Sequence, residues 1–256
     1  GRHVIHGEWE QAVMAYLSME GEHEEDEARA VRAHIRENGV EETVLEMLPR
    51  WMGFERRMIE HLLANENDHV GAFCKLPANL QLMTVHAAQS IVFNKSLHRR
   101  IEAGLPLATP VVGDIVGRID EKGQLDVNSC VTVEDRTMNR IARNCQLGRL
   151  MTTGPLPGSD VRTSSQQPGG IEEQVIVDEG LGEVSWFVED VPRLSTKGTR
   201  RGLITSFGEL SVDTVPVAEP SSLGDRWAQG PQEGERWHPE GACIRFRFTL
   251  SSGSYA

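Results

Sequence analysis

The polar side chains of the stretch Asn79 to Asn94, NLQLMTVHAAQSIVFN, are the first candidates for chemistry. His86, Ser90 and Asn94 are spaced four residues apart and Gln89 lies beside them, so on a helix all four share one stripe. The other residues are mostly apolar, which predicts a buried helix. Such a stripe must be satisfied, either by nearby loop backbone or as part of a functional site. The first role is the commoner one, and helical periodicity does not exclude the second.

Basic residues gather in three places that could bind phosphate groups. The clusters are Lys95, Arg99 and Arg100; Arg136, Arg140 and Arg143; and Lys197, Arg200 and Arg201. The second has the spacing i, i+4, i+7 of one helix face, and Gly198 in the third permits close backbone approach to a ligand. One such cluster is more often a solvated surface than a phosphate contact, but three in a net-acidic chain are less easily dismissed.

Other kinds of site find little support in the residue pattern. His3, His6 and Glu8 provide too few ligands for a metal, and Gly7 interrupts the helix that would hold them. The glycine-rich stretch 154–170 contains neither GxGxxG nor GK[ST]. None of the four cysteines lies in a CxxC pair, so neither a zinc site nor a disulfide framework is predicted. No spacing argues for a Ser-His-Asp or Cys-His pairing.

The composition is that of a globular protein with an acidic surface. The 256 residues include 38 acidic and 26 basic ones, giving a net charge of −12. Residues 1–50 hold 12 of the acids against 5 basic residues, so the excess is local and a basic surface elsewhere remains compatible with it. We expect no membrane span and no signal peptide, and a reducing cytoplasm as the location.

The elements that must position these residues change character at Gly104. We expect helices at residues 8–20, 25–37, 41–48, 53–64 and 79–94. Beyond Gly104 we expect strands at 111–119 and 124–127, a helix at 132–145, a loop-rich stretch at 148–170, a helix at 171–181, strands within 199–215 with a turn at Gly208-Glu209, and a last strand at 242–250. Thr132 and Asp135 suggest a capping box for the helix at 132–145. The fold class is therefore α+β.

The order of several motifs closely resembles the TruD family of tRNA pseudouridine synthases. That family's conserved helix, with its QSxxFN core, is similar to LPANLQLMTVHAAQSIVFNKSL, where the core falls on Gln89, Ser90, Phe93 and Asn94. The family's later segments are similar, in order, to PVVGDIV, VTVEDRTMNRIARN, TTGPLPGSD, GGIEEQVIVDEGL, STKGTRR and FRFTLSSGSYA. The resemblance covers nearly the whole chain.

This resemblance implies an enzyme that isomerises uridine to pseudouridine in tRNA, typically at position thirteen, without a metal or cofactor. The target uridine would be flipped out of its stack. An aspartate would assist cleavage of the glycosidic bond, and the uracil would rejoin the ribose through carbon 5. The partner would be tRNA, and we favour a monomer.

The chain departs from the family pattern at the catalytic aspartate. The family's motifs GxKDxxAxTxQ and NxFGxQRFG have no counterpart here, and Asp114 in VVGD resembles a structural turn residue. We therefore expect a C-terminal part of the enzyme with no catalytic residue of its own, cut at both ends and inactive alone. The catalytic aspartate would lie upstream of Gly1.

The resemblance also divides the chain into two domains. Residues 1–196 would form the family's inserted domain, helical over 1–104 and mixed α/β over 105–196, with 1–78 of the longer archaeal type. Residues 197–256 would supply strands of an incomplete mixed catalytic sheet. Their last strand would expose unpaired edge groups and apolar surface, so we expect this region to be poorly soluble alone.

The resemblance assigns a role to each candidate site residue. Gln89, Ser90 and Asn94 would support the pocket, and Ser254 and Tyr255 would lie near the target nucleotide. The residues on the RNA backbone would be Lys197, Arg200 and Arg201, with Arg136, Arg140 and Arg143 as further candidates.

Two other functions remain open. The chain could be a non-catalytic RNA-binding or scaffold protein that has lost the aspartate-bearing half, which the coding sequence upstream of Gly1 would reveal. It could instead be an acidic helical interaction module based on residues 1–104, which predicts a protein partner and no tRNA shift in a gel at low salt.

Overall fold

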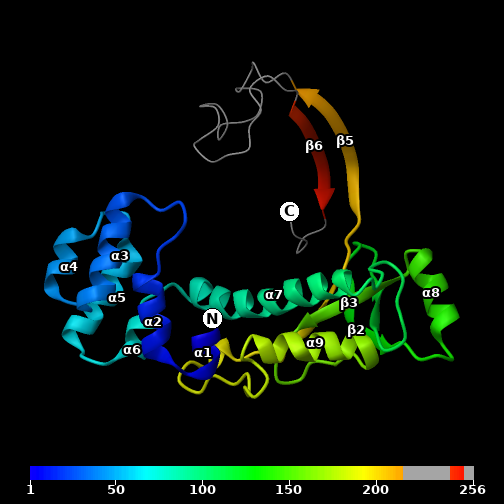
Figure 1. Cartoon of the computed structure of the whole chain (residues 1–256), viewed down its shortest axis with the longest axis horizontal. Coiled ribbons are helices and arrows are strands. Elements are labelled where there is room, and N and C mark those ends of the chain that lie inside the picture. Colours follow the sequence, from blue (N-terminus) through cyan, green and yellow to red (C-terminus); the bar gives the residue numbers. More distant parts are fainter. Residues whose placement is uncertain (216–242, 251–256) are drawn as a thin grey trace. The chain divides into compact units, whose positions relative to one another are not determined.

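The computed structural model describes residues 1–215 and 243–250 (Figure 1). The chain divides into two compact units. The first comprises residues 1–118 and 126–203, and the second comprises 119–125 and the residues after 203. Helices and antiparallel strands occur together, so the predicted α+β class is confirmed.

The first part of the chain is helical up to Glu102, as predicted. The helices are α1 (Arg2–His6), α2 (Trp9–Ser18), α3 (Asp26–Asn38), α4 (Glu42–Met47), α5 (Gly53–Ala64), α6 (His69–Phe73) and α7 (Ala78–Glu102). The short helices α1 and α6 were not predicted, because five residues show no periodicity. Helix α7 continues past the predicted end at Asn94, since KSLHRRIE contains no helix breaker.

One apolar core joins these helices. It includes Val13 and Leu17 of α2, Ile35 of α3, Ile59 of α5 and Val92 of α7, all essentially excluded from solvent. The rings of Trp9 and Phe73 pack at a centroid distance of 5.4 Å. The amphipathic spacing seen in the sequence is therefore what buries these faces.

A four-stranded antiparallel sheet follows the helices. Its strands are β1 (Ile115–Ile119), β2 (Leu125–Thr132), β3 (Leu150–Leu156) and β4 (Thr199–Gly202), in the order β2-β1-β3-β4. Strand β1 pairs with β3 through Val116 and Thr152, and β3 pairs with β4 through Thr153 and Gly202. The connecting elements are α8 (Met138–Gln146), α9 (Gln166–Asp178) and the 3-10 turn η1 (Pro192–Leu194).

The central strand β3 lies where a loop was expected. Gly154 and Pro155 suggested a loop because proline rarely occupies a central strand. The register explains the exception: residues 150–152 pair with β1 and residues 153–156 pair with β4. Each half of β3 thus bonds mainly to one neighbour, and Pro155 lies outside the segment that pairs with β1.

The boundaries of α8 and α9 also differ from the prediction. Strand β2 runs to Thr132, so the predicted capping box is wrong and α8 begins at Met138. Thr137 instead closes the turn before α8, where its hydroxyl accepts a hydrogen bond from the Glu134 amide. Helix α9 begins at Gln166, with Pro168 in its first turn, where proline is tolerated.

The second unit contains the ribbon of β5 (Phe207–Val215) and β6 (Cys243–Leu250), which pair antiparallel. The predicted turn at Gly208-Glu209 is instead an irregularity inside β5, where the register shifts and Glu209 has a φ of 52°. Apolar side chains of both strands are exposed, and Phe246 is 60% accessible. The predicted exposure of apolar surface on the last strand is therefore confirmed.

No helix in residues 1–215 or 243–250 is long and apolar enough to cross a membrane.

Candidate functional site

Helix α7 turns a polar as well as an apolar surface towards the interior. Gln81, Gln89, Ser96 and Arg100 are buried on the same face as Val85 and Val92. The opposite face is exposed although it carries apolar residues, Met83 at 59% and Ile91 at 45%. The prediction of a helix buried all round is therefore wrong.

The predicted polar stripe divides between these two faces. His86 and Asn94 are exposed and Ser90 is half-buried, whereas Gln89 is buried. Adjacent residues on a helix point about 100° apart, so Gln89 belongs to the inner face and the other three to the outer one.

Gln89 joins α7 to two loop segments. Its Nε2 donates to the carbonyl of Pro157 at 2.8 Å and to Oγ1 of Thr196 at 3.3 Å. Thr196 Oγ1 also accepts a hydrogen bond from the Gly198 amide at 3.1 Å. We call these contacts of Gln89, Pro157 and Thr196 the Gln89 clasp. A side-chain amide that bonds buried loop backbone in this way satisfies it and ties the two loop segments to α7.

The same two loop segments approach each other closely through glycine. A Cβ atom on Gly158 would lie 2.0 Å from the Gly198 amide nitrogen. Gly198 has a φ of 76°, and a Cβ atom there would meet the Leu156 carbonyl oxygen at 2.7 Å. The absence of a side chain at Gly198 therefore makes room for the neighbouring backbone of residues 156–158. The sequence alone predicts instead that this glycine makes room for a ligand.

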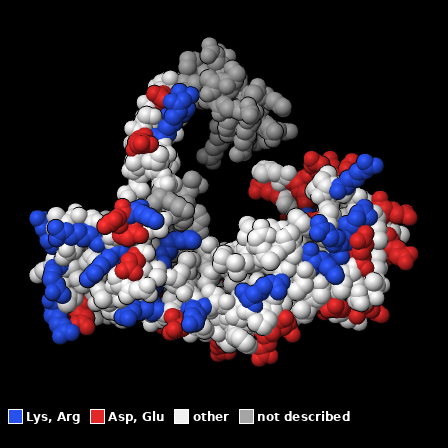
Figure 2. All heavy atoms as spheres, turned by 180° about the vertical axis from the view of Figure 1, so that it is seen from behind, with Lys and Arg blue, Asp and Glu red and all other residues white. Residues whose placement is uncertain are grey.

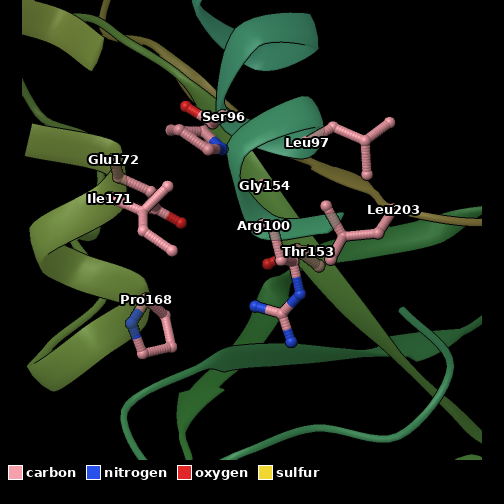
Figure 3. A pocket seen from close by; sticks show the side chains of 10 residues that line it. Ser96, Leu97, Arg100, Thr153, Gly154, Pro168, Ile171, Glu172 and Leu203 are labelled. Carbon is pink, nitrogen blue, oxygen red and sulfur yellow. The ribbon is translucent and has the colours of Figure 1, made fainter. Parts of the chain in front are cut away.

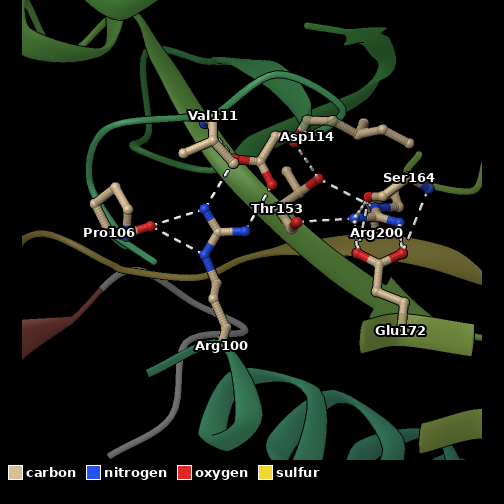
Figure 4. Close-up of polar contacts among 9 residues, drawn as sticks. Arg100, Pro106, Val111, Asp114, Thr153, Ser164, Glu172 and Arg200 are labelled. Carbon is tan, nitrogen blue, oxygen red and sulfur yellow. Dashed lines mark hydrogen bonds and ion pairs between the residues drawn. The ribbon is translucent and has the colours of Figure 1, made fainter. Parts of the chain in front are cut away.

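Arg200 lies inside the first unit with its guanidinium group bound by protein. Its NH1 and NH2 atoms donate to the two carboxylate oxygens of Glu172 on α9 at 2.9 and 2.7 Å (Figure 4). NH2 also donates to the Thr153 carbonyl and to Ser164 Oγ, and Nε donates to Thr153 Oγ1. Arg200 is 5% exposed. The sequence-based assignment of Arg200 to the RNA backbone therefore needs correction, since this arginine links β3, β4 and α9.

Arg100 forms a second buried ion pair nearby. Its NH1 and NH2 donate to the two carboxylate oxygens of Asp114 at 2.6 and 2.8 Å, and it also bonds to the Pro106 carbonyl. Asp114 in turn accepts from the Val111 amide at 2.7 Å (Figure 4). The expectation that Asp114 is a structural turn residue agrees with these contacts, whereas Arg100 is not available to phosphate.

A small cavity of about 10 Å³ lies between α7, β3 and α9. Figure 3 shows Ser96 and Arg100 of α7 beside it, with Thr153 of β3 and Glu172 of α9. The Ser96 hydroxyl is buried and has no hydrogen-bond partner among the described residues. This volume could hold about one water molecule, so the cavity is too small for a nucleobase.

Lys95 and Arg99 of α7 are engaged by α9. Lys95 pairs with Glu179 and Arg99 with Asp178. Hydrogen bonds from Arg99 and then from Gln174 hold the pKa of Asp178 below its ordinary value. Together with Arg100, all three members of the first basic cluster are committed to protein carboxylates.

Lys197 and Arg201 remain near the surface beside the Gln89 clasp. Lys197 is exposed, and its carbonyl accepts from the Asp160 amide. Arg201 is half-buried, with its Cζ atom 5.4 Å from the centroid of the Phe93 ring on α7, a cation–π distance. The third basic cluster thus contains one buried, one half-buried and one exposed residue.

Helix α8 and its neighbouring strands carry exposed arginines. Arg140 and Arg143 are exposed on α8, and Arg118 of β1 and Arg149 before β3 are exposed as well. Arg136 precedes the helix and pairs with Glu134, so the expected helix face of three arginines has two members. Arg118 and Arg149 were missed because no helical spacing connects them with α8.

The two histidines near the N-terminus make contacts with protein groups. His3 bonds to Glu8 at 2.7 Å and His6 to the Gly180 carbonyl. No group of three or more His, Cys, Asp or Glu side chains within residues 1–215 and 243–250 is arranged to hold a metal. Ser254 and Tyr255 lie outside the described residues.

Comparison with known proteins gives the class of protein to which this site belongs. The family model described as "tRNA pseudouridine synthase D (TruD)" matches residues 1–256. The chain therefore belongs to the TruD family.

Individual relatives come from archaea. The chain is 37% identical over 256 residues to the "Probable tRNA pseudouridine synthase D" of Methanosarcina mazei, of which it covers 54%. It is 32% identical to the protein of that name from Halobacterium salinarum, of which it covers 53%.

A solved structure supports the same conclusion at the level of the fold. The crystal structure of the putative TruD from Methanosarcina mazei superposes with a TM-score of 0.83 at 32% identity, over 100% of this chain and 54% of that one. The chain thus spans about half the length of the relatives it matches.

Proposed function

We propose that this chain is the part of a tRNA pseudouridine synthase that supports the uridine pocket and binds tRNA. The observation that carries the proposal is the family match over residues 1–256, combined with a span of about half of each relative. The aspartate motif that the family resemblance requires would be supplied by the remaining half. The reaction would convert uridine to pseudouridine at position thirteen of tRNA, in the cytoplasm, by a monomeric enzyme.

The Gln89 clasp supports this proposal by showing what the QSxxFN residues can do. Gln89 fixes the segments around Pro157 and Thr196 from the inside. Ser90 and Asn94 lie towards the outer surface of the same helix, where they would face the catalytic half. A rigid wall of this kind would hold a flipped uridine in position.

Cationic side chains outside the two buried ion pairs would hold the rest of the RNA. We assign Lys197 and Arg201 to backbone contacts beside the pocket, with Arg140 and Arg143 at a distance from it. Ser254 and Tyr255 would approach the target nucleotide. Residues 1–196 would be the inserted domain and residues 197–256 part of the catalytic domain. The first compact unit continues to Leu203 and so includes β4.

Reconstitution tests this proposal. The aspartate-bearing half of the Methanosarcina mazei relative would be joined upstream of this chain, and pseudouridine in a tRNA transcript would be measured by mass spectrometry. We expect the chimera to be active, the chain alone to be inactive, and replacement of the motif aspartate by alanine to abolish activity. A folded chimera that binds tRNA without forming pseudouridine would favour the alternative of a non-catalytic RNA-binding protein.

A further inference from the structure

Four exposed arginines from β1, α8 and the turn before β3 form what we call the α8 surface: Arg118, Arg140, Arg143 and Arg149. Arg118 pairs in register with Leu150 across β1 and β3, and Arg149 precedes Leu150. Helix α8 is held against these strands by Ile141, which packs with Val116 and Val133. A small hydrophobic cluster thus fixes the four arginines on one end of the sheet.

The charges of the α8 surface are not neutralised by the protein. None of the four side chains has a hydrogen bond or ion pair within the described residues, and residues 136–149 contain no Asp or Glu. Figure 2 shows Lys and Arg atoms gathered at the end that carries α8. Lys95 and Arg99 of α7, in contrast, are paired with carboxylates at the C-terminal end of α9. Uncompensated arginine in a chain of net charge −12 favours an anionic partner.

The sequence around this surface restricts the kind of contact. No Phe, Trp or Tyr occurs between Phe93 and Trp186. Proteins that hold single-stranded RNA stack bases on aromatic side chains, and the α8 surface has none to offer. Arginines without aromatics contact phosphates, which positions an RNA without reading its sequence.

We propose that the α8 surface docks the phosphate backbone of a double-helical segment of the RNA, at a distance from the isomerised uridine. The proposal rests on the function proposed above and adds the structural class of RNA that this surface takes. Double-stranded RNA is recognised by shape and backbone rather than by base edges. The arginines would therefore contribute to affinity for folded tRNA and not to the choice of uridine.

Binding to two RNAs of equal length tests the proposal. One is a hairpin of about 16 base pairs, which spans two minor grooves, and the other is an unstructured single strand. The chain of 256 residues is compared with the variant R140A/R143A/R149A and with the charge-matched control R29A/R50A/R57A in the helical array. We expect the wild type to prefer the hairpin and the α8 variant to bind it at least tenfold more weakly. The slope of log K against log salt should fall by about 2–3, since each lost phosphate contact removes somewhat less than one. The control variant should retain both the hairpin affinity and the salt slope of the wild type.

The outcomes separate this proposal from the proposed function. A wild type that binds RNA but prefers the single strand, or an α8 variant with unchanged hairpin affinity and salt slope, overturns the docking proposal and leaves the enzyme assignment intact. Absence of any RNA binding by the wild type at low salt overturns both. A raised KM on whole tRNA with an unchanged kcat in the reconstituted α8 variant supports docking outside the pocket.

Discussion

The arginines of the β3–β4–α9 interior and those of the α8 surface are the same residue type in opposite situations. Arg200 directs its NH1 and NH2 at both oxygens of Glu172 and is 5% exposed. Arg140 and Arg143 are exposed and have no partner in the described part of the chain. Removal of the first leaves a buried carboxylate without its counter-ion, whereas removal of the second leaves only solvent. The two regions should therefore respond to mutation in opposite ways.

Replacement of Arg200 by alanine should have the largest effect on stability. The substitution would leave the Glu172 carboxylate without its counter-ion and the Thr153 carbonyl without one donor. Breaking a buried ion pair typically costs about 3–5 kcal/mol of stability. Chemical denaturation with urea would measure the free energy of unfolding. The double variant R200M/E172L should be less damaged than R200A, because no unpaired charge remains. A stability of R200A within about 0.5 kcal/mol of the wild type would contradict the comparison.

Replacement of Gln89 by alanine should cost less, about 1–3 kcal/mol. The Pro157 carbonyl would lose its 2.8 Å hydrogen bond in a buried place. Urea denaturation again gives the free energy, and Asn94→Ala on the exposed side of α7 is the matched control, expected within about 0.5 kcal/mol. If both variants lost the same stability, the inner and outer faces of α7 would not differ as described.

Helix α7 also shows how far the sequence could lead. The existence of the helix and the importance of Gln89 were predictable from periodicity and from the family motif. Which face was buried was not, because Met83 and Ile91 are apolar and exposed whereas Gln81 and Arg100 are polar and buried. Periodicity counts apolar residues but does not reveal which polar residue has a partner far along the chain.

Arg200 and strand β3 illustrate the same limit for the rest of the site. Nothing in STKGTRR distinguishes Arg200, whose partner Glu172 is 28 residues away, from its exposed neighbour Lys197. Strand β3 was hidden by Gly154 and Pro155, since local sequence does not show that each half of the strand pairs with a different neighbour. Contacts between residues far apart in the sequence decide both the burial of Arg200 and the formation of β3, and a single sequence does not reveal such contacts.

The ion pair of Asp68 with His61 lies near the surface. We expect its effect on stability to fall between that of the buried Arg200 pair and that of the unpaired arginines of the α8 surface. A hydrogen bond from the Gly71 amide and then one from His61 lower the pKa of Asp68 below its ordinary value of 3.8. A lowered folded-state pKa means that the stabilisation is present above 3.8 and is lost as the pH falls through the folded value. Thermal unfolding between about pH 6 and about pH 3 should therefore show a steeper loss of stability for the wild type than for Asp68→Asn. Parallel pH profiles would contradict the contribution of this pair.

The double variant R140A/R143A should leave stability nearly unchanged while it weakens RNA binding. Exposed arginines without partners contribute little to folding, so we expect a change within about 0.5 kcal/mol by urea denaturation. Ile141→Ala on the opposite face of α8 removes a buried contact with Val116 and should cost about 2–5 kcal/mol. A large loss in R140A/R143A would show that the α8 surface is structural after all.

Ser96 provides the smallest and most discriminating test, because it is buried and polar yet has no hydrogen-bond partner among the described residues. Its hydroxyl lies beside the cavity of about 10 Å³ between the two buried ion pairs. If the hydroxyl contributes nothing, Ser96→Ala removes an unsatisfied group and should be neutral or slightly stabilising. If instead a water molecule bridges it to its polar neighbours, the substitution should cost about 1 kcal/mol, as loss of an ordinary hydrogen bond does. We expect the neutral outcome by urea denaturation, with Gln89→Ala in the same series to show what the loss of a satisfied buried group costs. Burial of a polar side chain on α7 would then stabilise the fold only where, as in the Gln89 clasp, the group has found its acceptor.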